Sequence, residues 1–244
     1  TQNKVRAEPV EISERNIANN QAQVIVCNAG NANACTGEQG RLGAEAMMRV
    51  TAELLNIPED DVIIASTGLI GEPFPTEDVV EGIRNNIHKL SDDAKAGSFV
   101  ANAILTTDTF AKEGFVEFVH DGKEINMAGI AKGSGMIHPN MATMLNFIVT
   151  DLKIDKKLLD KALRYCVDRS FNMITVDGDT STNDSFVVIA SQQASNPTIT
   201  DMDSADAQAL MAAMTEVAQY LAHAIVRDGE GATKFISVCV DGGR

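Results

Sequence analysis

The sequence has few of the residues that build metal sites and disulfide frameworks. Its four cysteines form no C-x-x-C pair, and a chain of 244 residues can be stable without disulfides. We therefore expect reduced thiols and an intracellular protein. The four histidines show no H-x-x-x-H or H-E-x-x-H spacing, so the sequence does not support a zinc site.

Positive charge is also scarce. The chain has 20 Lys and Arg against 34 Asp and Glu, a formal net charge of −14 at pH 7. Such acidity does not suit the phosphates of nucleic acids or of anionic membranes. No apolar run reaches the about 18 residues of a membrane span. We expect a soluble protein with no nucleic-acid or membrane partner. It should be cytoplasmic, or mitochondrial if its source is eukaryotic, since a sequence beginning at Thr1 shows no leader to judge.

Two binding loops are missing as well. Residues 228–234, Asp-Gly-Glu-Gly-Ala-Thr-Lys, lack the G-x-x-x-x-G-K-S/T pattern of a phosphate loop. Residues 177–184 superficially resemble a calcium loop, but Val188 stands where the twelfth position requires a glutamate ligand. We therefore expect neither a phosphate loop nor a calcium site.

The composition, 44% hydrophobic and 22% charged, fits a globular protein of one large domain or two closely packed ones. Apolar patterns predict strands at 22–27, 62–65, 99–105, 115–118, 124–130, 144–149, 186–190 and 235–240. They predict helices at 40–55, from a Thr76 cap to about 90, 155–171 and 201–227. With a hairpin turned at Asp121-Gly122, this order predicts an α+β fold, a layered sandwich of sheets and helices.

One stretch combines a glycine turn with a threonine at the start of a predicted strand. Gly133 and Gly135 allow backbone conformations that side chains would block, and Pro139 restricts its own φ. The apolar run 144–149 follows directly. Thr143 therefore lies where an irregular loop becomes a buried strand.

A threonine in this place can act as a nucleophile only if a base lies beside it. Cleavage of the Ala142–Thr143 bond would supply one, because the new α-amine has a pKa of about 7.7–8.0 and is partly neutral near physiological pH. The same hydroxyl could make the cut by attacking the Ala142 carbonyl, which gives an ester that water opens. β-Branching limits the positions of the Thr143 hydroxyl.

The run from Lys132 to Leu145, Lys-Gly-Ser-Gly-Met-Ile-His-Pro-Asn-Met-Ala-Thr-Met-Leu, resembles the self-cleavage segment of the ornithine acetyltransferase (glutamate N-acetyltransferase) family of arginine biosynthesis. Residues 66–71, 106–109, 177–184 and 228–234 also resemble family segments, so the resemblance covers nearly the whole chain. It implies a fold of the N-terminal-nucleophile type. It also implies that the chain breaks before Thr143, which then carries the acetyl group between substrates.

The resemblance further implies one catalytic domain, residues 1–244, that appears short at both ends relative to the family. After self-cleavage, residues 1–142 would form an α-chain part and residues 143–244 a β-chain part. These two fragments would remain partners, and αβ units would form a homo-oligomer.

Matching residue by residue assigns roles to the other site residues. Thr67 and Gly68 match the oxyanion hole, where each preorganised donor is worth about 2.7–4 kcal/mol. Lys132 matches the active-site lysine, whose charge would lower the pKa of the Thr143 amine and could hold a carboxylate. Substrate would bind at Thr106 or Thr107, between which the sequence does not choose. Glu230 matches a carboxylate that contacts substrate.

The implied reaction is a ping-pong acetyl transfer from N-acetylornithine to glutamate through acetyl-Thr143. It uses no metal or organic cofactor, and whether acetyl-CoA serves as a co-substrate stays open. One rival is an N-terminal-nucleophile amidase or aminopeptidase, in which water resolves the acyl-enzyme. Another is an inactive truncated chain that folds without cleaving or turning over.

Self-cleavage is directly testable by the intact mass of the denatured protein. We expect two fragments that meet at Ala142/Thr143, because the Thr143 hydroxyl makes the cut, and a single uncut chain for Thr143→Ala. An uncut wild-type chain would contradict this, provided that the chain extended at both ends also stays uncut.

Overall fold

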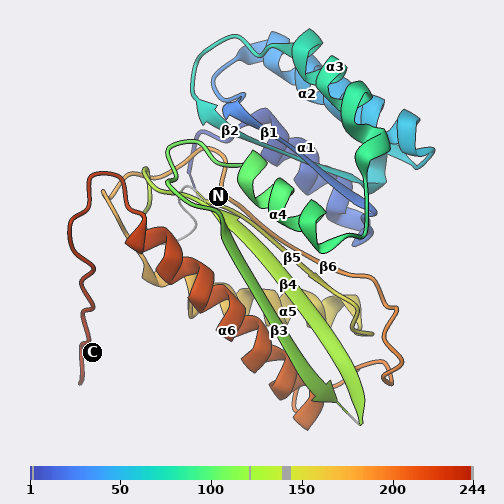
Figure 1. Cartoon of the computed structure of the whole chain (residues 1–244), viewed down its shortest axis with the longest axis vertical. Coiled ribbons are helices and arrows are strands. Elements are labelled where there is room, and N and C mark those ends of the chain that lie inside the picture. Colours follow the sequence, from blue (N-terminus) through green and yellow to red (C-terminus); the bar gives the residue numbers. More distant parts are fainter. Residues whose placement is uncertain (2, 121, 139–143, 243–244) are drawn as a thin grey trace.

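The computed structural model describes the chain except residues 2, 121, 139–143 and 243–244 (Figure 1). The predicted nucleophile Thr143 and its neighbour Ala142 lie outside the described residues. The architecture is α+β, with two separate sheets that pack between two sets of helices. This confirms the α+β part of the predicted fold class.

The first sheet pairs two parallel strands, β1 (Val24–Asn31) and β2 (Val62–Leu69). Helix α2 (Gly37–Leu55) connects them, as parallel strands require a crossover. Alternate residues of β2 face opposite ways, so Val62 and Ile64 pack against the helices. The helical side of this core contains Ile12 of α1 (Glu8–Asn16) and four α2 residues, Ala44, Met47, Met48 and Ala52. Helix α3 (Thr76–Asn86) packs beside α2.

The second sheet has the order β3-β4-β5-β6. Strands β3 (Lys112–His120) and β4 (Lys123–Lys132) form the predicted hairpin, and Gly122 takes the positive φ of 68° that its turn requires. Strand β5 (Leu145–Thr150) pairs antiparallel with β4 and parallel with β6 (Ser185–Ala190). The β-branched runs in β5 and β6 formed strands where the sequence predicted them.

Two helices cover one face of this second sheet (Figure 1). Helix α5 (Lys156–Asp168) begins at Asp155, whose carboxylate accepts a hydrogen bond from the Lys157 N–H at 2.9 Å. Helix α6 (Ala205–Arg227) is long and apolar enough to cross a membrane by length and composition alone. In the structure it packs on β3, β4 and α5, and 50% of its most apolar window is buried. The helix is therefore part of the core of the protein.

The opposite face of the second sheet meets the first sheet. A small cluster joins Ala65 of β2 to Leu145 and Phe147 of β5, with Ile25 and Ile130 packed against it. The layers thus run helix, sheet, sheet, helix. Because the ends of β2 and β4 meet across this junction, polar residues at these strand ends are brought together.

Three local predictions are wrong. Residues 99–105 were expected to form a strand, but α4 (Ala94–Ala103) occupies most of them. The Asp93 carboxylate caps this helix by accepting from the Lys95 N–H at 2.9 Å, and only Ala101 and Ile104 of the apolar run are buried, at helical spacing. Thr76 is not a cap, because Pro75 occupies that position without a side-chain hydrogen bond and Thr76 is already helical.

The third wrong prediction is the strand at 235–240. These residues are described and have no strand assignment, and Ile236, Val238 and Val240 are exposed. An apolar, β-branched run forms a strand only when another strand edge pairs with it.

The junction between α6 and the second sheet should dominate stability. Leu221 is fully buried beside Gly129 of β4, so Leu221→Ala should lower the free energy of unfolding by about 2–5 kcal/mol. Denaturant unfolding followed by circular dichroism measures this. The matched change Glu216→Ala, on an exposed position of the same helix, should stay within about 0.5 kcal/mol of wild type. Equal effects of both changes would contradict the predicted role of the α6 junction.

Candidate active site

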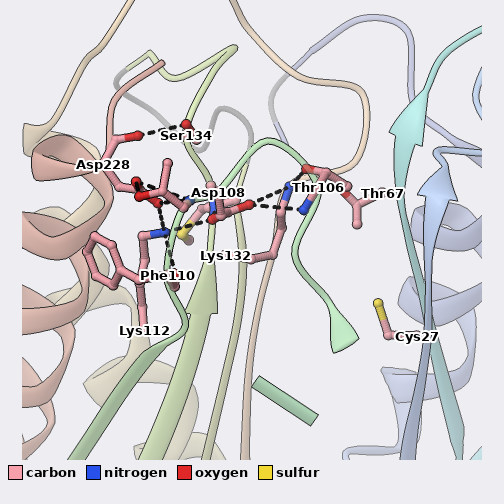
Figure 2. Close-up of polar contacts among 12 residues, drawn as sticks. Cys27, Thr67, Thr106, Asp108, Phe110, Lys112, Lys132, Ser134 and Asp228 are labelled. Atoms are coloured by element: carbon pink, nitrogen blue, oxygen red, sulfur yellow. Dashed lines mark hydrogen bonds and ion pairs between the residues drawn. The ribbon is translucent and has the colours of Figure 1, made fainter. Parts of the chain in front are cut away.

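Lys132 lies at the centre of a polar cluster where the two sheets meet. It is the last residue of β4 and pairs in register with Leu145, so its side chain shares the inter-sheet face with Ile130 and Leu145. The residue is only 3% exposed. Its ammonium donates to the Thr67 hydroxyl at 3.1 Å and to the Thr106 hydroxyl at 2.7 Å (Figure 2). Lys132 therefore contacts both Thr67 and Thr106, which the sequence also assigned to the site.

Gly68, beside Thr67 at the end of β2, cannot be replaced without strain. It has φ +131° and pairs in register with Gly30, which has φ +110°. A Cβ on Gly68 would lie 2.2 Å from the Gly30 carbonyl carbon. This close approach of two backbones is the physical reason for glycine at position 68.

The structure also separates the two candidate substrate threonines. Both are exposed, and the Thr106 hydroxyl accepts a hydrogen bond from the Lys132 ammonium. Glu230 is exposed and lies against the glycine turn, since a Cβ on Gly135 would be 2.6 Å from its Oε2. Its backbone N–H donates to the Ser134 carbonyl at 2.8 Å. Glu230 thus binds the glycine turn through Ser134, and Lys132 lies directly before that turn in the chain.

Asp108 is a central member of the cluster that sequence reasoning missed. Its Oδ1 accepts hydrogen bonds from the Lys112 ammonium at 2.8 Å and from the Gly133 N–H at 2.7 Å. Its Oδ2 accepts from the Thr106 N–H at 3.2 Å and lies 3.7 Å from the Lys132 Nζ. The Asp108 side chain is fully buried. One carboxylate therefore orders the glycine turn, the Thr106 loop and both lysines.

Asp228, directly after α6, completes this network. It accepts from the Lys112 ammonium at 2.6 Å and from both the N–H and the hydroxyl of Thr109. Its carbonyl accepts from the Ser134 hydroxyl at 2.7 Å. Two lysines and two aspartates balance in charge, as buried ions require. Asp108 and Asp228 lie in stretches that carry the family resemblance, which was the available signal, whereas nothing in the sequence marks Lys112.

The pKa values follow from burial and from these contacts. Burial lowers the pKa of Lys132, and the nearby Asp108 charge opposes that effect. Burial alone would raise the pKa of Asp108, but hydrogen bonds from Lys112 and Gly133 and the Lys132 charge hold it below its usual value. Burial raises the pKa of the Cys27 thiol to about 12, and the charge of Lys132 opposes this more weakly. This thiol is therefore protonated at neutral pH and is a poor nucleophile.

Asp184 is a second carboxylate that the sequence did not single out. It lies directly before β6, is 1% exposed, and accepts a hydrogen bond from the Met144 N–H at 2.8 Å. Burial raises the pKa of Asp184 to about 7, although the Met144 N–H and the Thr1 ammonium act in the opposite direction. This buried carboxyl therefore binds the backbone of Met144, the residue that follows Thr143 in the sequence.

The described residues contain no group of three or more His, Cys, Asp or Glu side chains arranged to hold a metal ion. What the described cluster offers is a buried cation, two threonine hydroxyls and a glycine strand end. Such groups stabilise negative charge on oxygen. The fold and site thus define an α+β protein with a preorganised anion-stabilising centre.

The chain belongs to the ArgJ family, whose family model matches residues 1–244. It is 48% identical over 240 residues to an arginine biosynthesis bifunctional protein ArgJ from Caldanaerobacter subterraneus subsp. tengcongensis, covering 98% of this chain and 59% of the relative. It is 47% identical to the ArgJ protein of Listeria monocytogenes serovar 1/2a, with 99% and 60% covered. The chain thus spans about 60% of the length of these curated relatives.

Two solved structures of related proteins also resemble this chain. The crystal structure of an arginine biosynthesis bifunctional protein ArgJ from Bacillus halodurans matches with a TM-score of 0.54 and 42% identity, over 58% of this chain and 74% of that one. An ornithine acetyltransferase from Mycobacterium tuberculosis, complexed with ornithine, matches with a TM-score of 0.50 and 28% identity, over 57% and 74%. Both support the family membership.

Asp184 should make stability depend on pH. In the unfolded chain the Asp184 carboxyl has its ordinary pKa of 3.8, whereas in the folded protein its pKa is about 7 and it stays protonated up to that pH. Its stabilising contribution is therefore full below pH 4 and is lost as pH rises towards 7, at up to about 1.4 kcal/mol per pH unit.

We expect Asp184→Asn to remove this decline, measured as urea unfolding between pH 4 and pH 8. Asp179→Asn changes an exposed carboxylate of the same loop and should leave the wild-type pH dependence unchanged. A decline that persists in Asp184→Asn would show that another group causes it.

Proposed function

We propose that this chain carries the cleavage site and acyl-transfer centre of a self-processing acetyltransferase of arginine biosynthesis. The enzyme moves the acetyl group of N-acetylornithine to glutamate through an acetyl ester on Thr143. The observation that carries the proposal is the buried Lys132 ammonium between the Thr67 and Thr106 hydroxyls. This cluster lies on the glycine turn that leads towards Thr143.

The geometry of Thr67 suits an oxyanion hole. Its hydroxyl oxygen already accepts a hydrogen bond from Lys132, so its own proton stays available for a developing negative oxygen. Gly68, the next residue of β2, would supply a backbone N–H. The buried positive charge of Lys132 strengthens the hydroxyl donor, since a charge in a water-poor site acts more strongly than in solvent.

In the forward half-reaction, the Thr143 amine accepts the proton of the Thr143 hydroxyl, whose oxygen attacks the acetyl carbonyl. The tetrahedral oxyanion is held by Thr67 and Gly68. It collapses to acetyl-Thr143 as ornithine leaves with the proton. The amine of glutamate then attacks the ester, and the same donors hold the second oxyanion. This oxyanion collapses to acetylglutamate as the bond to the Thr143 oxygen breaks, and the proton released by the glutamate amine passes through the Thr143 amine to that oxygen.

Substrate recognition is assigned to two groups on either side of this centre. Thr106 accepts from Lys132 and can donate its own proton to a substrate carboxylate, and this contact with the buried ammonium favours it over Thr107. The exposed carboxylate of Glu230, beside Gly135, is suited to a substrate ammonium. Lys132 also offsets locally the formal net charge of −14, which disfavours an anionic substrate.

Several further features belong to the proposal. The fold would be of the N-terminal-nucleophile type, and the protein would act in the cytoplasm as an oligomer of αβ units. Names of relatives support the reaction: the matched ArgJ proteins are called bifunctional in arginine biosynthesis, and the matched acetyltransferase was crystallised with ornithine.

The test is acetyl transfer from radiolabelled N-acetylornithine, with and without glutamate. We expect acetylglutamate only when glutamate is present. Lys132→Met should reduce kcat/KM about 10²–10³-fold, because the buried cation that supports the oxyanion donors is lost. Lys157→Met, on the exposed face of α5, should leave the rate unchanged.

Release of acetate without glutamate would instead identify an amidase-type hydrolase. A cleaved chain that transfers no acetyl group, even when extended at both ends to the length of its relatives, would contradict the proposal.

A further inference from the structure

Asp108 contacts two lysines that belong to opposite faces of the same sheet. Lys112 pairs in register with Ala131 of β4, so both face the α6 side of the sheet. Lys132 follows Ala131 in β4 and therefore faces the opposite way, towards the first sheet. The Asp108 carboxylate reaches the Lys112 Nζ with one oxygen at 2.8 Å and the Lys132 Nζ with the other at 3.7 Å (Figure 2). It therefore links the two faces at the end of the sheet.

The surroundings of Lys132 match a charged amine. A protonated lysine has three N–H donors and no acceptor. Two donors are used on the hydroxyls of Thr67 and Thr106, and the Asp108 carboxylate faces the same ammonium. A neutral amine would carry a lone pair, which would accept a hydrogen bond from one of the hydroxyls. The charge of Lys132 therefore decides where the two hydroxyl protons point.

From this geometry we propose that Asp108 is a positioning residue, which keeps the buried Lys132 protonated and so keeps the Thr67 and Thr106 hydroxyl protons directed at the substrate. The part that concerns substrate rests on the proposed function. The part that concerns the charge of Lys132 stands on the contacts alone.

Charged and titratable groups from several elements surround Lys132. Cys27 comes from β1, Lys112 from β3, Asp108 from the segment between α4 and β3, and Asp228 from the end of α6. Burial lowers the pKa of Lys132 most, Asp108 raises it, and Lys112 lowers it.

Asp228 has an indirect part in this balance. It binds Lys112 at 2.6 Å, so that this lysine has a carboxylate of its own besides Asp108. The charge of Asp108 is therefore not fully neutralised by Lys112 and remains effective on Lys132. Glu230 lies near the glycine turn but is exposed, and its charge is screened by solvent.

The direct test is Asp108→Asn, which keeps the shape of the side chain and removes its charge. The pKa of Lys132 is followed by NMR of its Cε and Nζ nuclei in labelled protein. We expect the pKa of Lys132 to fall below the wild-type value. The alkaline limb of the kcat/KM profile should move to lower pH, with a loss of about tenfold or more on that limb.

Asp228→Asn is the matched comparison, because it removes the carboxylate of the same network that contacts Lys112 instead of Lys132. It should lower the pKa of Lys132 by less than Asp108→Asn does, since it acts only through Lys112. If Asp108 only holds the fold together, both variants will lower stability alike and neither will move the Lys132 titration. That result would overturn the proposal.

A second variant should shift the pKa of Lys132 in the opposite direction. It also tests the proposal if Asp108→Asn does not fold. The double change Lys112→Met with Asp228→Asn removes one buried ion pair as a unit, which proteins often tolerate. It leaves Asp108 facing Lys132 alone, so the pKa of Lys132 should rise. A pKa that stays constant or falls would overturn the proposal.

The lysine titration needs no substrate, which separates the two proposals. A Lys132 titration that follows both changes in a protein without acetyl transfer would support the role of Asp108 and contradict the proposed function. If the protein transfers acetyl groups but neither change shifts the pKa of Lys132, the proposed function is supported and the role of Asp108 is contradicted.

Discussion

The structure depends on keeping two ammonium groups charged in a place that water does not reach. Lys112 is 1% exposed and Lys132 is 3% exposed, and an unpaired charge at such depth costs several kcal/mol. Asp108 and Asp228 offset that cost, and their remaining lone pairs are used by backbone and hydroxyl donors. Because the four residues come from three separate segments, the network also determines how the glycine turn, the Thr106 loop and the end of α6 lie together.

Local sequence predicted the parts of the fold that local physics decides. The β-branched runs of β2, β5 and β6, the Asp-Gly hairpin and the long α6 all formed close to the expected residues. Residues 99–105 and 235–240 have a similar apolar pattern, yet the first is mostly helix and the second is exposed chain. The first segment has a helix cap before it, and the second has no described strand edge paired with it. Neither condition follows from hydrophobic pattern alone.

The same limit explains which site residues could be found. Thr67, Thr106 and Lys132 stood in stretches of recognisable sequence, and the structure brought them together. Asp108 lies in a stretch that carries the family resemblance, but its contacts with Gly133 and Lys132 arise only on folding. Lys112 was missed because its role depends on a distant pairing with Asp228, 116 residues away. An ion pair of this kind leaves no spacing or composition signal, so only the folded chain reveals it. Asp184 was missed for a different reason, since its properties come from burial.

The antiparallel pairing of β4 with β5 has a consequence for the molecularity of folding. If the chain is cut between Ala142 and Thr143, one fragment contains β4 and the other contains β5 and α6. Strands β4 and β5 share six register pairs, and α6 packs across both β3 and β4. The nicked protein would stay associated, but its unfolded state would be two separate polypeptides. Refolding would then become a second-order reaction that slows on dilution, whereas the uncut precursor folds in a unimolecular step at any concentration. The order of events is thereby constrained, because the cut is best made after the sheet has formed.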